Sequence, residues 1–142
     1  MTDKKVINSK ARIMSKIKKF LSLKSEIIFC YIHGSFLYPL VSPSSPQRDI
    51  DIALYVDPEK ISYDNAFDYS FQLSLDITKC INREVDIQIL NYAPLGFRHS
   101  VFKNGELLFS KDENIRSNII ESTTLDYVDF YELSLQYIRD LV

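Results

Sequence analysis

Three acidic residues and one glycine–serine pair are the residues of this sequence whose types and spacing could support chemistry. Gly34 and Ser35 follow an apolar run, Asp49 and Asp51 come after thirteen intervening residues, and Asp86 lies much later. Because side chains alternate between the two faces of a strand, Asp49 and Asp51 point to the same side, and a neighbouring strand can bring Asp86 to them. Clustered carboxylates repel one another unless cations lie between them, so the pattern predicts a divalent-metal site.

The glycine–serine pair is suited to a phosphate-binding turn beside those acids. Gly34 lacks a side chain, so its backbone can approach a phosphate closely, and Ser35 adds a hydroxyl to the neighbouring N–H groups. Two Mg²⁺ ions on Asp49 and Asp51 would bridge a triphosphate, while Asp86 would complete the second ion's ligands or accept a proton. Phosphoryl-type transfer needs mainly positioning and charge neutralisation, so these residues predict a nucleotidyl-transfer site.

Each of these signals is weak when it stands alone. An Asp-X-Asp pair often lies on the solvent face of a strand, a lone Asp86 is typical of an edge strand, and Gly-Ser alone is weaker still. Their order on three successive predicted strands favours catalysis over these structural interpretations. Arg48 could steer phosphate or form an ion pair with Asp49. His33 is interpreted as a strand-end residue rather than a base, and His99 has no neighbours that suggest a metal site.

Periodicity predicts an α/β order of elements around these residues. Apolar residues at helical spacing predict an amphipathic helix over 9–24, and a continuous apolar run predicts a buried strand over 26–33. A proline-bearing loop over 38–47 separates it from a strand over 49–56. The later expected elements are a helix over 63–81, a strand over 84–90, a short helix over 94–102, a turn at 104–105, a strand over 106–109 and one or two helices over 113–141.

Two sets of apolar residues bear on packing. In the helix over 63–81, one line of apolar side chains is widened by a second, which gives a broad apolar stripe. In the tail, periodicity cannot separate packing on the sheet from an interface with a partner. In the helix over 63–81, the first line of side chains is Phe67, Phe71, Leu75 and Thr78, and the second line is Leu73, Ile77 and Ile81.

Length and composition limit the class of protein. A chain of 142 residues with 46% hydrophobic and 25% charged residues predicts one globular domain over 1–142, with a helical tail from about 113 to 142. No apolar run could cross a bilayer, and the N-terminal stretch lacks a signal-peptide core, so the expected location is the cytoplasm. Cys30 and Cys80 are predicted to be small core residues rather than a disulfide or zinc site.

The net charge of −2 hides an asymmetry between the two ends of the chain. Eight of the 17 basic residues fall in the first 24 positions, whereas seven acids and two arginines occur from Asp112 onward. Solvated helix faces are the favoured explanation, and contact of the basic helix with an acidic partner or a polyanion is the alternative. Beyond that helix the sequence has no basic, aromatic surface, so nucleic-acid binding is not expected.

The chain resembles the minimal nucleotidyltransferase (MNT) family of the polymerase-beta-like superfamily. Members of that family carry a Gly-Ser pair, an Asp-X-Asp motif and a third aspartate on a later strand. Here these positions are Gly34, Ser35, Asp49, Asp51 and Asp86. The resemblance therefore implies a phosphate-binding role for the first two residues and a metal-ligand role for the three acids. It covers nearly the whole chain.

Within that family, the chain looks most like the MNT antitoxins encoded beside HEPN ribonuclease toxins. This narrower resemblance rests on the segments 93–98, 104–109 and 126–129. It implies a polymerase-beta-like fold, with a small mixed sheet flanked by helices and a helical C-terminal tail. It also implies an enzyme that transfers AMP from ATP, with magnesium, to a tyrosine hydroxyl of a cognate HEPN toxin. That modification would silence the toxin, with which the chain could form a hetero-oligomer.

One segment departs from the family pattern, and two other functions stay open. Family loops after the serine are usually shorter and often carry an arginine and a glycine early. Here the thirteen residues 36–48 contain no glycine and only Arg48, so nucleotide preference is left open. One alternative is a non-catalytic antitoxin that binds its toxin by contact alone, against which the three acids argue. The other is a nucleotidyltransferase acting on a small molecule or RNA end, which usually needs an added domain.

Overall fold

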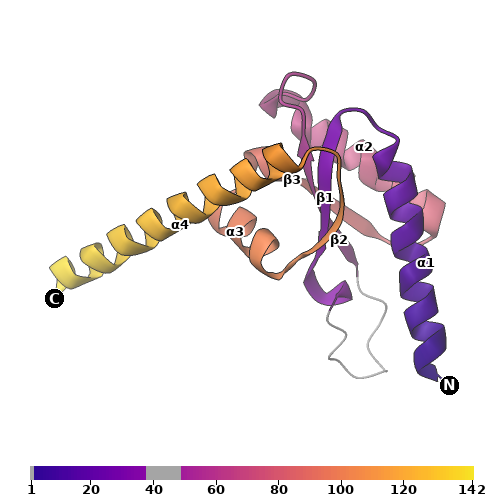
Figure 1. Ribbon diagram of the computed structural model, residues 1–142, viewed down its shortest axis with the longest axis horizontal. Helices are drawn as coiled ribbons and strands as arrows, with labels where there is room; N and C mark the ends of the chain where they lie inside the picture. Colours follow the sequence, from indigo (N-terminus) through magenta and orange to yellow (C-terminus); the bar gives the residue numbers. More distant parts are fainter. Residues whose placement is uncertain (1, 38–48) are drawn as a thin grey trace.

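The computed structural model describes residues 2–37 and 49–142. A four-stranded sheet forms the centre of the molecule, with helices on both faces (Figure 1). The strand order is β3-β2-β1-β4, in which β2 and β3 are parallel and the other pairs are antiparallel. The predicted mixed sheet flanked by helices is therefore confirmed. The strands are β1 (Ile27–His33), β2 (Ile50–Val56), β3 (Val85–Ile89) and β4 (Glu106–Ser110).

Each face of the sheet has its own helical cover. Helices α1 (Thr2–Ser22) and α2 (Tyr63–Ile81) pack on one face, where the larger apolar cluster lies. Helix α3 (Leu95–Asn104) and the first part of α4 (Glu113–Leu141) cover the other face, over the smaller cluster. Helix α4 begins where the Asp112 side chain accepts a hydrogen bond from the Ile115 amide at 3.0 Å, a stabilising N-cap. Two 3₁₀ turns complete the fold, η1 (Gly34–Phe36) and η2 (Leu90–Tyr92).

The observed elements follow the predicted order, with differences at their ends. Helix α2 has the predicted bounds, α1 begins seven residues earlier than predicted, at Thr2 rather than position 9, and the tail forms one helix. The predicted turn at 104–105 is wrong, because α3 continues through Asn104 and the Gly105 amide donates to the Val101 carbonyl at 2.8 Å. A Cβ on Gly105 would lie 2.5 Å from that carbonyl oxygen, so a glycine fits where α3 meets the sheet.

The apolar stripe of α2 is only partly covered. Leu73 and Ile77 are buried against the sheet, whereas Phe67 and Phe71 are 76% and 56% exposed. Cys80, predicted to be a core residue, is exposed because it lies beside the buried line of α2 and not on it. Cys30 is buried in β1 as predicted, and burial raises the pKa of its thiol.

Helix α4 has two halves with different surroundings. Its first half packs on α3. Arg98 of α3 donates a hydrogen bond from Nη2 to the hydroxyl of the buried Thr123 at 3.0 Å. The rings of His99 and Tyr127 stack with their centroids 3.8 Å apart. Its second half projects from the body (Figure 1), so its apolar side chains do not pack on the sheet. The larger of these exposed residues are Phe130, Tyr131, Leu133, Tyr137, Ile138 and Leu141.

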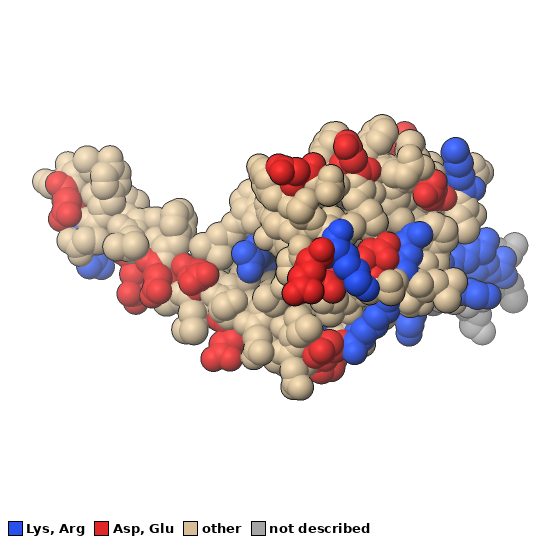
Figure 2. Space-filling view, turned by 90° about the horizontal axis from the view of Figure 1, so that it is seen from above, with Lys and Arg blue, Asp and Glu red and all other residues tan. Residues whose placement is uncertain are grey.

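The charge asymmetry of the sequence is visible on the surface. Figure 2 shows Lys and Arg side chains gathered at the α1 end of the molecule and Asp and Glu side chains along the projecting part of α4. Lys16, Lys18 and Lys19 are exposed, as solvated helix faces require. Every helix in the described residues is too polar or too short to span a bilayer.

Candidate active site

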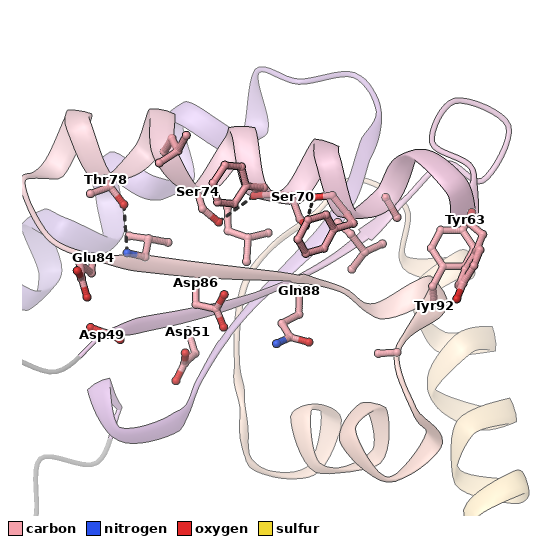
Figure 3. Close-up of a pocket in the computed structure, with 18 of the residues that line it drawn as sticks. Asp49, Asp51, Tyr63, Ser70, Ser74, Thr78, Glu84, Asp86, Gln88 and Tyr92 are labelled. Carbon is pink, nitrogen blue, oxygen red and sulfur yellow. Dashed lines mark hydrogen bonds between the residues drawn. The ribbon is translucent and has the colours of Figure 1, made fainter.

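Strand pairing brings three of the polar residues into one row across the sheet. His33 on β1 pairs with Asp51 on β2, and Asp51 pairs with Asp86 on β3. Residues paired in this way point to the same face, and neighbouring strands lie about 4.8 Å apart. Figure 3 shows Asp51 and Asp86 together on the side of β3 that faces away from α2. The row therefore joins two acids from different strands with a histidine from a third.

Asp49 lies at the open end of this row. It immediately precedes β2 and is exposed, whereas Asp51 is half-buried. The two acids are two residues apart, so alternation directs them to the same face, and both line the same groove. The intervening Ile50 points to the opposite face and is fully buried. Alternation along one strand thus places both carboxylates at the site while the residues between them hold the strand in the core.

The turn after β1 closes against Asp51. Gly34 has a φ of +81°, a left-handed conformation that favours glycine. A Cβ at this position would lie 2.6 Å from Oδ2 of Asp51, closer than real Cβ contacts allow. Gly34 therefore permits both the turn and the close approach of the carboxylate. Ser35 lies in the same turn, η1.

The electrostatics of the row reflect burial and crowding of like charges. Burial raises the pKa of Asp51, the carboxylates of Asp86 and Asp49 raise it further, and His33 opposes them. Burial also lowers the pKa of His33, although Asp51 and Asp86 act in the opposite direction. The His33 ring packs edge-on against Phe97 with centroids 5.3 Å apart, and its Nε2 atom is buried without a hydrogen-bond partner in the described structure.

The donor set fits a divalent cation. Carboxylate oxygens are the ligands that Mg²⁺ prefers, and the mutual repulsion felt by Asp51 is what a cation between the acids would relieve. Within residues 2–37 and 49–142, no three His, Cys, Asp or Glu side chains already converge as a metal cage. Asp49, Asp51 and Asp86 could hold the ion after side-chain rotation.

Two of the sequence predictions lie outside the described residues. Arg48, predicted to steer phosphate or to pair with Asp49, is one, and the proline-bearing loop over 38–47 is the other. Conversely, sequence reasoning interpreted His33 only as a strand-end residue. Its position beside Asp51 depends on the antiparallel register of β1 and β2, and its only sequence signal is that it directly precedes Gly34.

The acids lie at one side of a larger groove of about 950 Å³. The groove continues around β3 to the exposed face of α2, which the sequence did not connect with the site. Tyr63 and Tyr92 lie at its far end with ring centroids 5.6 Å apart, and the Tyr92 hydroxyl donates to the Ile61 carbonyl at 2.7 Å. Gln88 lies along β3 from Asp86, on the same face (Figure 3).

Comparison with solved structures shows the same fold. A chain of a toxin–antitoxin complex with AMP-PNP is 20% identical with a TM-score of 0.69, over 90% of this chain and 97% of that one. A tri-AMPylated Shewanella oneidensis HEPN toxin in complex with its MNT antitoxin contains a chain that is also 20% identical, with a TM-score of 0.69 over 93% and 98%. A chain of the toxin–antitoxin MntA-HepT is 19% identical, with a TM-score of 0.68 over 92% and 97%.

Comparison with sequences identifies the family. A comparison with curated proteins gave no match. Residues 15–114 match the family model described as polymerase beta, nucleotidyltransferase. That range is most of the chain and contains Gly34, Asp49, Asp51 and Asp86. The chain therefore belongs to the polymerase beta nucleotidyltransferase family.

Proposed function

We propose that this chain is a Mg²⁺-dependent protein adenylyltransferase that transfers AMP from ATP to a tyrosine hydroxyl of a cognate HEPN ribonuclease toxin, and so acts as its antitoxin. The observation that carries the proposal is the row of His33, Asp51 and Asp86 beside the Gly34 turn. Family membership supports nucleotidyl transfer. The fold shared with an MNT antitoxin in complex with a tri-AMPylated HEPN toxin supports the choice of AMP and of this partner.

In the proposed reaction, each group of the site has a defined task. Asp49, Asp51 and Asp86 would hold Mg²⁺, and the ion would neutralise triphosphate charge. The left-handed turn at Gly34 offers backbone N–H groups to a phosphate. The tyrosine oxygen forms a bond to the α-phosphorus, the bond from that phosphorus to the bridging oxygen breaks, and pyrophosphate leaves. Asp86, which is exposed, accepts the hydroxyl proton.

Other features of the molecule agree with a role as an antitoxin. The projecting half of α4 carries exposed apolar residues such as Phe130 and Leu133, which suit contact with a protein partner.

The charge state of His33 agrees with a cation at the site. Burial lowers the pKa of His33 and favours its neutral form, so His33 adds little positive charge to compete with a cation. The proposed substrate ATP is consistent with action in the cytoplasm.

Mass spectrometry of the partner tests the proposal directly. The purified chain is incubated with ATP, Mg²⁺ and the toxin encoded by the neighbouring gene, which should be a small all-helical protein. We expect a tyrosine of the toxin to gain AMP with the wild type and not with Asp51→Asn. An unmodified toxin, with an enzyme that is folded and binds Mg²⁺, would overturn the proposal.

Protection of cells separates catalysis from binding alone. The exposed apolar half of α4 favours toxin binding as a second candidate function. Cells that express the toxin are given either the wild type or a double variant, Asp49→Asn with Asp51→Asn. Undiminished protection by the double variant would assign neutralisation to contact. AMP found on an aminoglycoside or an RNA end, but not on the toxin, would instead assign the third candidate.

A further inference from the structure

Strand β3 has an outer edge beside the candidate site that pairs with no other strand of the described residues. Within the described residues β3 is an edge strand, so no strand pairs with its outer side. The Glu84 carbonyl accepts from the Ile50 amide of β2 at 3.0 Å, and the backbone groups of successive residues point to opposite edges. Val85 and Ile87 therefore direct theirs outward. The Val85 amide agrees with this direction, because it donates to the Thr78 hydroxyl at 3.2 Å. That amide is therefore already used, and an added strand would pair with the other outward groups of β3.

The groove around this edge has one acidic side and one apolar side. Asp51 and Asp86 line it on the side away from α2, as Figure 3 shows. Phe67, Phe71 and Leu75 line it on the side of α2, and Leu75 is 41% exposed. The rings of Phe67 and Phe71 stack with centroids 6.3 Å apart, so they form one continuous apolar surface. The outer edge of β3 lies between the two sides.

The charges of the groove select its occupant. Five carboxylates line it, and the described lining residues include no lysine or arginine. Such a lining attracts cationic groups and repels polyanions such as RNA. A peptide segment that carries lysine or arginine is therefore favoured over nucleic acid. The five carboxylates belong to Asp49, Asp51, Asp64, Glu84 and Asp86.

We infer that an extended segment of the acceptor protein binds by adding a strand to the outer edge of β3. Its acceptor tyrosine faces Asp86, and the apolar residues on either side of that tyrosine face Phe67 and Phe71 on α2. Added strands lie about 4.8 Å from their neighbour, so the tyrosine becomes the fourth member of the row of His33, Asp51 and Asp86. The inference rests on the proposed function and adds the site and the sequence pattern of the acceptor.

A designed peptide tests the apolar side of the groove. The probe is Lys-Lys-Val-Thr-Val-Tyr-Val-Thr-Val-Lys-Lys, in which every second residue faces α2 when tyrosine faces the acids. With the full chain, ATP and Mg²⁺, Phe71→Ser should raise KM for the peptide about tenfold and leave KM for ATP unchanged. The matched control is Leu23→Ser, since Leu23 is 80% exposed outside the groove, and it should change neither constant.

N-methylated peptides test strand addition. Adjacent backbone amides of an added strand point to opposite edges, so methylation should weaken binding strongly at one of two adjacent central positions and not at the other. Equal effects at the two positions would overturn the inference. So would a Phe71→Ser variant whose KM changes for ATP instead of the peptide, or a polyanionic RNA oligonucleotide that displaces the peptide.

A binding measurement separates this inference from the proposed function. Fluorescence anisotropy of a labelled peptide is measured with Asp51→Asn and no ATP, so that binding is observed without transfer of AMP. Suppose that adding Phe71→Ser weakens peptide binding while the wild type transfers no AMP. That result supports the docking site and removes the proposed function. AMP transfer to the peptide with a KM that Phe71→Ser does not change supports the function and removes the docking site.

Discussion

The two faces of β2 are made of alternate residues of one strand, yet they differ in cover and in use. On the face toward α1 and α2, all four residues are fully buried. On the other face, Asp51 is half-buried at the open end. Further along the strand, Ala53 is buried, and the ring of Tyr55 stacks on that of Phe29 with centroids 5.0 Å apart. The first face thus supplies stability along its whole length. In the proposed function, the second face supplies chemistry only where α3 and α4 leave it open. The four residues of the closed face are Ile50, Ile52, Leu54 and Val56.

The largest effect expected is on the closed face. Ile52→Ala removes a fully buried side chain at the centre of the sheet, so the free energy of unfolding should fall by about 3–5 kcal/mol. Urea denaturation measures the change, and Ile52→Val should cost about 1 kcal/mol. Transfer activity per folded molecule should persist. A loss of activity with unchanged stability would break the comparison.

On the open face, Asp51→Asn should impair chemistry and spare the fold. Removing this carboxylate should lower the rate of AMP transfer roughly 10²–10³-fold, about 3–4 kcal/mol of transition-state stabilisation. The free energy of unfolding should not fall, because the substituted amide carries no charge for burial and Asp86 to disfavour. Rates of pyrophosphate release and urea denaturation measure the two effects.

The pH dependence of stability provides a second test of Asp51. Because folding raises the pKa of Asp51, its contribution to stability is present below the unfolded pKa and is lost as pH rises through the folded pKa. Metal-free wild type should therefore lose stability over that window relative to Asp51→Asn. The opposite slope would show that ionised Asp51 is stabilised by the fold, and the comparison of the two faces would then need revision.

At the turn that borders the open face, stability and chemistry should change together. Gly34→Ala places a Cβ 2.6 Å from the Asp51 carboxylate in a left-handed conformation, so we expect a loss of about 1–2 kcal/mol and slower transfer. Gly96→Ala is the matched control, because no atom lies within 4 Å of the added Cβ and α3 is helical there. It should stabilise the chain by up to about 1 kcal/mol. Equal effects of the two substitutions would remove the special role of Gly34.

The contrast between the two faces was largely predictable, because it follows from alternation within one strand. The common side of Asp49 and Asp51 and the bounds of α2 are local properties of the sequence. The pairing of Asp51 with Asp86 could be predicted only as a possibility, since it depends on which strands become neighbours. The position of His33 beside Asp51 was missed for the same reason.

The exposed stripe of α2 shows a different limit. Periodicity gives the width of an apolar stripe, but the width that is covered depends on how far the sheet extends beneath the helix. Among residues 2–37 and 49–142 the sheet ends at β3, so Leu73 and Ile77 are buried and Phe67 and Phe71 extend beyond the edge. No pattern within residues 63–81 contains that information.

The smallest effect expected lies at the rim of the closed face. The Tyr69 hydroxyl of α2 donates to the Glu26 carboxylate at 2.8 Å. Burial opposes ionisation of Glu26. Hydrogen bonds from its own backbone amide and from Tyr69, together with the charges of Lys24 and Lys60, outweigh burial, so the pKa of Glu26 is lowered. Tyr69→Phe removes one of these bonds and should cost about 1 kcal/mol at neutral pH, measured by urea denaturation.

Acid titration shows whether this polar pair contributes to the closed face. A lowered pKa means that Glu26 adds stability above its unfolded value of 4.5, and that this stability is lost as pH falls through the folded pKa. The difference between wild type and Tyr69→Phe should therefore shrink below pH 4.5. A difference independent of pH would mean that Tyr69 acts through packing, and then the closed face would depend on apolar contacts even at its rim.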